Sequence, residues 1–170
     1  GETSCKIWGI GGDGTVGANK NTITTIGLAA GMYAQAYFSY DSKKSGGLTQ
    51  SHLRFGKQPI QATYLVQHAD FVALHEPAYL GTYDVTADLK DGGTFLLNCS
   101  WSREELASHI PAKMKRDLAR KHANMYIIDA TRIAREIGLG NRTNTVLQAA
   151  FFKLTDIIPL DLAIQEMKDG

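Results

Sequence analysis

Residues W-G-I-G-G-D-G-T-V-G-A-N-K-N (Trp8–Asn21) indicate the fold class, because they join an apolar segment to a helical pattern through a loop rich in glycine. Glycine lets a backbone turn sharply and approach a phosphate or another chain closely. The preceding residues, Cys5–Ile10, predict a buried first strand, and Thr15–Leu28 predicts a helix. A strand, a glycine loop and a helix in this order are the context of a phosphate-binding loop.

This loop allows three interpretations. Gly9, Gly11 and Gly14 fit G-x-G-x-x-G, and Asp41 closes the second predicted strand, where a dinucleotide-binding fold carries its ribose-binding acid. The G-D-G at positions 12–14 matches the start of a thiamine diphosphate motif, but the asparagines that complete such a motif do not follow. The third interpretation is a tight turn against which other chains pack.

Composition bounds the class of protein. A chain of 170 residues is long enough for one substantial core. The 18 Lys and Arg nearly balance the 17 Asp and Glu, which argues against an electrostatic nucleic-acid binder. No apolar run is long enough to span a membrane. Cys5 and Cys99 are too few for an iron–sulfur cluster and predict buried free thiols in a reducing cytoplasm.

Strand and helix signals alternate along the chain. Strands are predicted at Cys5–Ile10, Met32–Tyr40, Ser51–Phe55, Asp70–Leu74, Thr94–Asn98 and Met125–Ile128. Helices are predicted at Thr15–Leu28 and Ala78–Leu89, after a capping box at Ser102, from Pro111 to Lys121, and at Ala130–Ile137 and Asn144–Ile158. This alternation predicts an α/β domain with a parallel or mixed sheet that is covered on both faces.

Two further groups of polar residues are candidate sites. The loop D-S-K-K-S-G-G (Asp41–Gly47) places Lys43, Lys44 and Ser45 near the carboxyl edge of the sheet, as a phosphate site or as a solvated hairpin tip. His75-Glu76 ends a strand, where a satisfied polar pair is the simpler interpretation. The basic helix after Pro111 predicts a solvated face or a patch for an acidic partner. No complete catalytic set and no metal site emerge.

Four segments carry a resemblance to a known family. They are W-G-I-G-G-D-G-T-V-G-A-N-K-N (Trp8–Asn21), Y-D-S-K-K-S-G-G-L-T-Q-S-H-L-R-F-G (Tyr40–Gly56), G-G-T-F-L-L-N-C-S-W (Gly92–Trp101) and L-G-N-R-T-N-T-V-L-Q-A-A-F-F-K-L (Leu139–Leu154). Together they closely resemble the gamma-type domain of pyruvate:ferredoxin (flavodoxin) oxidoreductase, or pyruvate synthase. The likeness runs from about Cys5 to Pro159 and implies a single three-layer α/β/α domain with a mixed, mostly parallel sheet.

The resemblance also implies a function. The family oxidatively decarboxylates pyruvate to acetyl-CoA and CO2, using thiamine diphosphate, Mg and [4Fe–4S] clusters, and passes electrons to ferredoxin or flavodoxin. Residues 1–170 would then be one gamma-type domain of a larger multidomain enzyme that is cytoplasmic and homo-oligomeric. The thiamine and cluster sites would lie in other domains or subunits, so this domain would bind no cofactor alone and be inactive by itself.

The role expected for this domain is interdomain packing and access for coenzyme A. No catalytic residue transfers to it from the family. The expected contacts with coenzyme A or with neighbouring domains are Lys43, Lys44, Ser45, Arg54, Gly11, Gly12, Asp13 and Gly14. The alternative function is a free-standing NAD(P)-binding Rossmann-like domain, and a third is an interaction module in which the glycine turn is inert.

Overall fold

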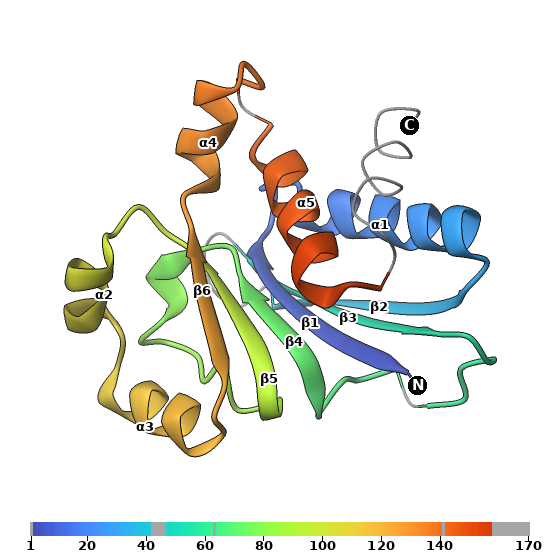
Figure 1. The fold of residues 1–170 in the computed structure, drawn as a ribbon, viewed down its shortest axis with the longest axis horizontal. Helices are drawn as coiled ribbons and strands as arrows, with labels where there is room; N and C mark the ends of the chain where they lie inside the picture. The colour runs from blue at the N-terminus through green and yellow to red at the C-terminus, as the bar shows by residue number, and fades with distance from the viewer. Residues whose placement is uncertain (1, 42–46, 63, 141, 158–170) are drawn as a thin grey trace.

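One six-stranded sheet organises the fold. A computed structural model describes residues 2–41, 47–62, 64–140 and 142–157. In these ranges the strands pair in the order β2-β3-β1-β4-β5-β6 (Figure 1). They are β1 (Thr3–Ile10), β2 (Tyr33–Asp41), β3 (Leu48–Gly56), β4 (Ala69–Leu74), β5 (Leu89–Asn98) and β6 (Asn124–Ile128). β3 pairs antiparallel with β1 and β2, whereas the β1–β4, β4–β5 and β5–β6 pairs are parallel.

Helices cover both faces of this sheet. They are α1 (Thr15–Ala30), α2 (Arg103–His109), α3 (Ala112–Arg120), α4 (Ala130–Glu136) and α5 (Thr143–Thr155). α1 and α5 pack on one face, while α2 and α3 pack on the other (Figure 1). The predicted three-layer α/β/α domain with a mixed, mostly parallel sheet is therefore confirmed. No helix in the described ranges is both long and apolar enough to cross a bilayer.

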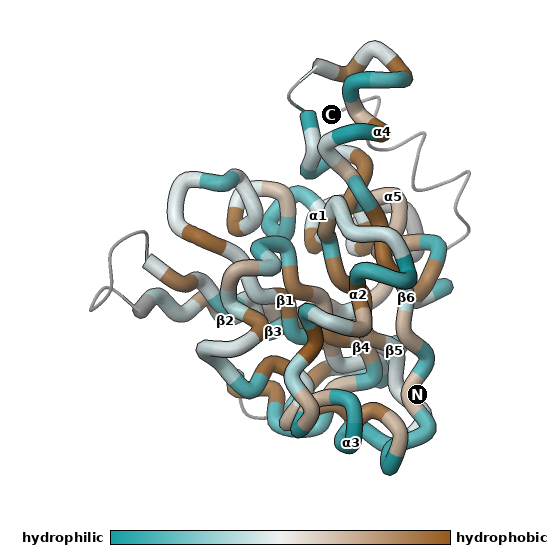
Figure 2. The backbone as a smooth tube through the Cα atoms, turned by 90° about the vertical axis from the view of Figure 1, so that its left-hand side faces the viewer, coloured by the Kyte–Doolittle hydropathy of each residue, from teal (hydrophilic) through white to brown (hydrophobic). Residues whose placement is uncertain are grey.

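Two hydrophobic cores lie on the two faces because successive strand residues point to opposite sides. Val72 and Leu74 of β4 belong to the core under α2 and α3, whereas Phe71 and Ala73 belong to the core under α1 and α5. Strands buried on both faces need apolar residues at nearly every position, as β4 has. Figure 2 shows this hydrophobic colouring along the central strands, in contrast to the largely hydrophilic α3.

The predicted helix Ala78–Leu89 is wrong. Only Pro77–Tyr79 forms a short 3-10 helix, and the chain then makes consecutive turns until β5 begins at Leu89. These turns are closed by backbone bonds from Thr82 N to Tyr79 O (3.1 Å) and from Ala87 N to Asp84 O (3.2 Å). Asp and Thr side chains compete with the helical backbone for hydrogen bonds, and Gly81 adds flexibility, so apolar spacing did not suffice for a helix.

The strand predicted at Thr94–Asn98 begins earlier, because β5 starts at Leu89 and includes Asp91, Gly92 and Gly93. Ala69 pairs with Leu89 while Phe71 pairs with Thr94, so β5 carries extra residues relative to β4 and forms a bulge. Gly92 adopts φ 75°, which glycine tolerates without steric cost, and its N–H donates to the Lys121 carbonyl at 2.6 Å.

The predicted capping box is confirmed, since Ser102 and Glu105 exchange backbone-to-side-chain hydrogen bonds of 3.2 Å.

A buried histidine fixes the segment that follows β3. His52 is 4% exposed, and its Nδ1 accepts a hydrogen bond from Val66 N at 3.0 Å. Accepting at Nδ1 requires that atom to be unprotonated. Burial, with the neighbouring Lys6 charge, lowers the His52 pKa from 6.5 to about 4. The neutral ring therefore holds the chain around Val66 against β3.

This arrangement predicts a pH-dependent stability. Because the folded pKa lies below the unfolded one, the unfolded chain takes up the proton first, and the free energy of unfolding falls as pH drops from 6.5 to about 4. His52→Asn keeps an acceptor for Val66 N and removes the titrating group. We expect urea unfolding of this variant to depend less on pH across that range than unfolding of the wild type. Equal pH dependence of the two proteins would contradict the assignment.

Candidate functional site

The candidate site lies at the carboxyl edge of the parallel strands, where α/β sheets bind ligands. The glycine loop follows β1, His75 and Glu76 follow β4, Asn98 ends β5, and Asn144 stands in the first turn of α5. These elements enclose a cavity of about 220 Å³. The described residues that line the cavity are Ile10, Asp13, His75, Glu76, Asn98, Thr143, Asn144 and Leu147.

Asp13 holds the glycine loop together. Its carboxylate accepts hydrogen bonds from Ile10 N (3.0 Å) and Thr15 N (2.8 Å), which joins the end of β1 to the start of α1. Its carbonyl accepts from Asn144 Nδ2 at 2.6 Å. The carboxylate thus lies at the positive end of the α1 dipole and takes two N–H groups that a phosphate-binding loop would offer its ligand.

The glycines of this loop permit close contact and an unusual backbone. A Cβ added at Gly9 would lie 2.6 Å from Thr15 Oγ1, and one at Gly14 would lie 2.7 Å from Asn144 Nδ2. Gly12 and Gly14 both adopt φ 86°, which residues with a side chain rarely do. The glycine pattern is therefore accounted for by the tight packing of α1 and α5 on the end of β1.

His75 forms the floor of the cavity. Its Nδ1 lies 2.9 Å from Thr15 Oγ1, and burial lowers its pKa to about 4, so the ring is neutral at neutral pH. Its carbonyl accepts from Asn98 Nδ2 (3.2 Å), and Asn98 Oδ1 accepts from Ala130 N (3.0 Å), which connects the ends of β4, β5 and β6. Each polar group at this edge thus positions a neighbouring strand end.

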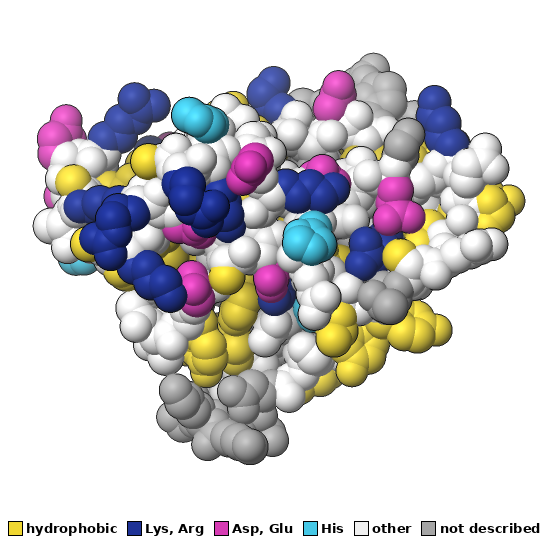
Figure 3. Space-filling model, turned by 90° about the horizontal axis from the view of Figure 1, so that it is seen from below, with side chains coloured by type: hydrophobic (Ala, Val, Ile, Leu, Met, Phe, Trp, Pro, Cys, Tyr) yellow, Lys and Arg dark blue, Asp and Glu magenta, His cyan; other side chains and the backbone are white. Residues whose placement is uncertain are grey.

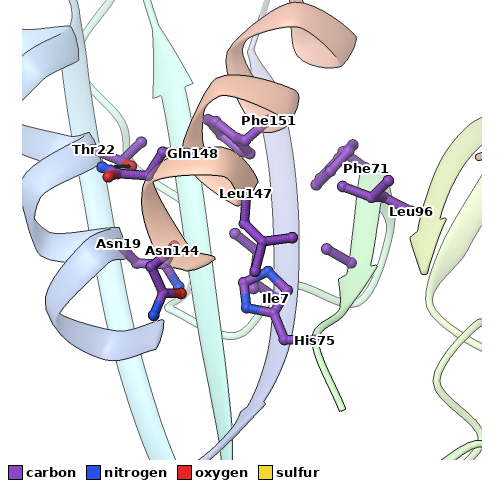
Figure 4. Close-up of a pocket in the computed structure, with 11 residues that line it drawn as sticks. Ile7, Asn19, Thr22, Phe71, His75, Leu96, Asn144, Leu147, Gln148 and Phe151 are labelled. Carbon is purple, nitrogen blue, oxygen red and sulfur yellow. Dashed lines mark hydrogen bonds between the residues drawn. The ribbon is translucent and has the colours of Figure 1, made fainter. Parts of the chain in front are cut away.

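A row of polar side chains joins α1 and α5 next to the cavity. Gln148 Nε2 donates to Ala18 O (3.1 Å) and to Thr22 Oγ1 (3.2 Å). Figure 4 shows Asn19 and Thr22 of α1 facing Asn144 and Gln148 of α5, with His75 and Leu147 beside them. The small pocket they share has a volume of about 10 Å³, which leaves room for a single water at most.

The predicted contact residues do not all come together. Gly11, Gly12, Asp13 and Gly14 form the loop beside the cavity, and Gly11 N donates to the carbonyl of Gly47 at 2.6 Å. Lys43, Lys44 and Ser45 lie outside the described residues, just before Gly47.

Arg54 lies apart from the glycine loop, near the opposite end of β3. It pairs with Ser4 in the strand register, and its guanidinium donates to Ser4 Oγ (2.9 Å) and Leu65 O (2.8 Å). Leu48, the residue of β3 nearest the glycine loop, is six positions away, or roughly 20 Å along the strand. Arg54 therefore does not share a site with that loop.

The sheet topology does not fit a dinucleotide fingerprint. In such a fold the strand after the first helix lies beside the first strand, with its terminal acid near the glycine loop. Here Asp41 of β2 pairs with Leu48 of β3, and Leu48 pairs with Ile10 of β1. β2 is thus two strand spacings, or about 10 Å, from β1.

The basic helix also differs in part from its prediction. Figure 3 shows Lys and Arg gathered at the end of the molecule that carries α3. Lys113, Lys115, Arg116 and Arg120 are exposed, but Lys121 is only 6% exposed and donates to Thr86 O at 2.7 Å. Lys121 therefore fixes the turns before β5 and does not belong to a binding face.

Sequence reasoning missed Thr15, Asn98 and Asn144 as site residues. Asn98 could have been found, because it ends a predicted strand as His75 does. Thr15 and Asn144 carry no motif of their own. The packing of α5 beside the glycine loop brings Asn144 to the cavity, and Thr15 Oγ1 contacts the ring of His75, which lines it. Among the described residues no group of three or more His, Cys, Asp or Glu could hold a metal ion.

Comparison with known proteins identifies the family. Residues 4–170 match the family model of Pyruvate ferredoxin/flavodoxin oxidoreductase. The chain belongs to this family. It is 58% identical, over 166 residues, to the pyruvate:ferredoxin oxidoreductase of Moorella thermoacetica, and the match covers 98% of this chain but 14% of that protein. The chain thus spans about one seventh of the length of that relative.

Two solved structures share the fold. The pyruvate oxidoreductase subunit PORC of Thermotoga maritima superposes with a TM-score of 0.72 at 21% identity, covering 99% of this chain and 84% of that one. The 2-oxoglutarate:ferredoxin oxidoreductase of Magnetococcus marinus, solved with 2-oxoglutarate, coenzyme A and succinyl-CoA, matches with a TM-score of 0.64 at 15% identity. That match covers 99% of this chain and 30% of the other.

The close packing at the glycine loop yields a test with a matched control. Gly9→Ala should lower the free energy of unfolding by about 1–3 kcal/mol, because the new Cβ would crowd Thr15 Oγ1. Gly17→Ala, within α1 and with no described atom within 4 Å of its Cβ, should raise it by about 0.5–1 kcal/mol. Urea unfolding measures both. Similar effects of the two substitutions would contradict the packing role of Gly9.

Proposed function

We propose that this chain is one gamma-type domain, residues 1–170, of a pyruvate:ferredoxin or flavodoxin oxidoreductase. The proposal rests on the family match over residues 4–170 together with the small share of the Moorella relative that the chain covers. In the parent enzyme pyruvate is oxidatively decarboxylated to acetyl-CoA and CO2, and electrons pass to ferredoxin or flavodoxin. Thiamine diphosphate, Mg and the [4Fe–4S] clusters are held by other parts of the parent, so the isolated domain is inactive.

The contribution proposed for this domain is access for coenzyme A. The Asp13 carboxylate already takes two N–H groups of the glycine loop, and the described lining of the cavity holds Asp13 and Glu76 but no Lys or Arg. Such a lining repels phosphate and suits uncharged groups. We therefore assign the phosphates of coenzyme A to Lys43, Lys44 and Ser45, and its uncharged arm to the cavity.

The position of this lysine loop supports the assignment. The loop begins after Asp41 and ends at Gly47, and the pairings of Asp41 and Gly47 put both ends at the carboxyl edge of the sheet. Lysine binds phosphate as a point charge. The likeness in fold to a 2-oxoacid oxidoreductase solved with coenzyme A is a further reason to look for that ligand at this edge.

The parent enzyme is also proposed to be a cytoplasmic homo-oligomer, as the family resemblance implies. Cys5 and Cys99 are both free and buried, and burial raises the pKa of each thiol, so both are inert. Free thiols of this kind suit a reducing compartment. The remaining domains or subunits of the parent are the direct partners of this chain.

Removing the lysines tests the role of the loop. In the full-length parent, Lys43→Ala together with Lys44→Ala should raise the KM for coenzyme A and leave pyruvate decarboxylation at the thiamine unchanged. A lost contact between a charged group and phosphate costs about 1.5–3 kcal/mol, which is roughly ten- to a hundredfold in affinity. Steady-state kinetics with varied coenzyme A measures the change.

Lys57→Ala is the control. Lys57 is an exposed lysine that directly follows β3, at the end of that strand away from the lysine loop. It should leave the KM for coenzyme A unchanged. If the double variant folds normally and keeps the wild-type KM, the lysine loop does not hold the phosphates.

A further inference from the structure

The outer edge of β2 is not paired with any strand of the described residues. β2 is the terminal strand of the sheet and runs for nine residues, Tyr33–Asp41. It pairs with β3 in continuous register from Tyr33 with Gly56 to Asp41 with Leu48, without a bulge. No strand among the described residues covers its other side. Every second residue of an edge strand directs its N–H and C=O groups outward, so β2 presents a row of unused hydrogen-bonding groups.

Free edge strands are normally guarded, and β2 has none of the usual guards. Proteins protect such edges with Lys, Pro, bulges, inward charges or very short strands. The sequence Y-A-Q-A-Y-F-S-Y-D contains no proline and no basic residue, and its one charged residue, Asp41, stands at the end of the strand. The opposite edge strand, β6, has five residues and is about half as long.

Aromatic side chains accompany this free edge. Tyr33 and Tyr37, on one face of β2, are 50% and 41% exposed, and Tyr40, on the other face, is 63% exposed. Tyr64 is 62% exposed, and its ring is tilted against that of Tyr37 with centroids 5.9 Å apart. In Figure 3 hydrophobic side chains gather along the lower border of the molecule, away from the Lys and Arg over α3. Exposed tyrosines that lie together, as Tyr37 and Tyr64 do, are typical of protein interfaces, because they bury large area at low entropic cost.

We propose that β2 is an internal docking edge, on which an uncharged extended segment from another part of the same parent polypeptide adds as a seventh strand. The proposal rests on the proposed function, which makes this chain one domain of a longer enzyme. The chain covers 14% of the Moorella relative, so most of such a parent lies outside residues 1–170 and can supply this segment. β-strand addition takes its affinity from main-chain hydrogen bonds and its specificity from alternate side chains, here the tyrosines.

The occupant is expected to be uncharged because β2 carries a charge only at its last residue. The nine residues of β2 are tyrosine, alanine, glutamine, phenylalanine and serine at the first eight positions and Asp41 at the last. Cross-strand pairs of aromatic and β-branched residues stabilise such a contact, whereas a desolvated charge opposite tyrosine would lack a partner. The expected segment is therefore rich in β-branched and aromatic residues.

Hydrogen–deuterium exchange of the full-length parent tests this proposal. We expect peptides covering residues 33–41 to exchange at least about tenfold more slowly in the wild type than in a variant carrying Tyr33→Lys and Tyr40→Lys. Lysine on an edge strand opposes pairing, and both positions are exposed enough to accept it without loss of the fold. Tyr126→Lys, on β6 at 46% exposure, is the matched control and should leave exchange in residues 33–41 unchanged.

Each outcome decides a different point. Rapid exchange of residues 33–41 in an active wild-type pyruvate oxidoreductase overturns the docking edge and leaves the proposed function standing. Slow exchange in a parent without that activity overturns the proposed function alone. Chemical cross-linking identifies the occupant: cross-links from β2 within one polypeptide support the proposal, whereas cross-links between two copies assign the edge to a subunit interface and overturn it.

Discussion

The joint between β1 and α1 depends on the carboxylate of Asp13. Two backbone N–H groups, from Ile10 and Thr15, donate to it, and Asn144 Nδ2 donates to the Asp13 carbonyl. These contacts join the first strand and first helix to the last described helix, 131 residues farther along the chain. Because an ionised carboxylate accepts stronger hydrogen bonds than a neutral group, the Asp13 side chain fixes the loop conformation, while the backbone carbonyl of the same residue holds α5 through Asn144.

The same interaction changes the chemistry of the site. A glycine loop at a helix N-terminus would ordinarily offer a concave surface to an anion, but here a side chain of the loop supplies that anion. Neutral His75 and the carboxylate of Glu76 continue the surface without a positive charge among the described lining residues. Glycine patterns alone therefore do not establish phosphate binding, because the residue between the glycines determines the local charge.

Two different edges of the sheet carry the two contacts that we propose. The carboxyl edge gathers loops from β1, β4 and β5 with the start of α5 around a cavity, whereas β2 leaves a long uncharged strand at the side. A domain that is built into a larger polypeptide can keep such an edge, because the neighbouring segment is always present at high effective concentration. A free-standing protein with this edge would be prone to self-association.

The family and most of the order of the strands and helices could be predicted from the amino-acid sequence. Apolar strands alternating with helices, the capping box at Ser102 and the glycine loop after β1 are local signals, and each corresponds to a local backbone preference. Where local preferences conflicted, sequence reasoning failed: the segment after Pro77 has apolar spacing for a helix, yet its Gly, Asp and Thr residues favour turns.

Which residues share a site depends on contacts between distant parts of the chain, and local sequence patterns do not reveal them. Arg54 stands on the same strand as Leu48 but at its far end, and the antiparallel course of β3 carries it away from the glycine loop. Asn144 reaches the cavity because α5 packs beside α1, and Thr15 meets His75 from the end of another strand; no local pattern encodes either contact. Strand order likewise separates β2 from β1, since pairing partners are chosen by packing across the whole sheet and not by neighbouring residues.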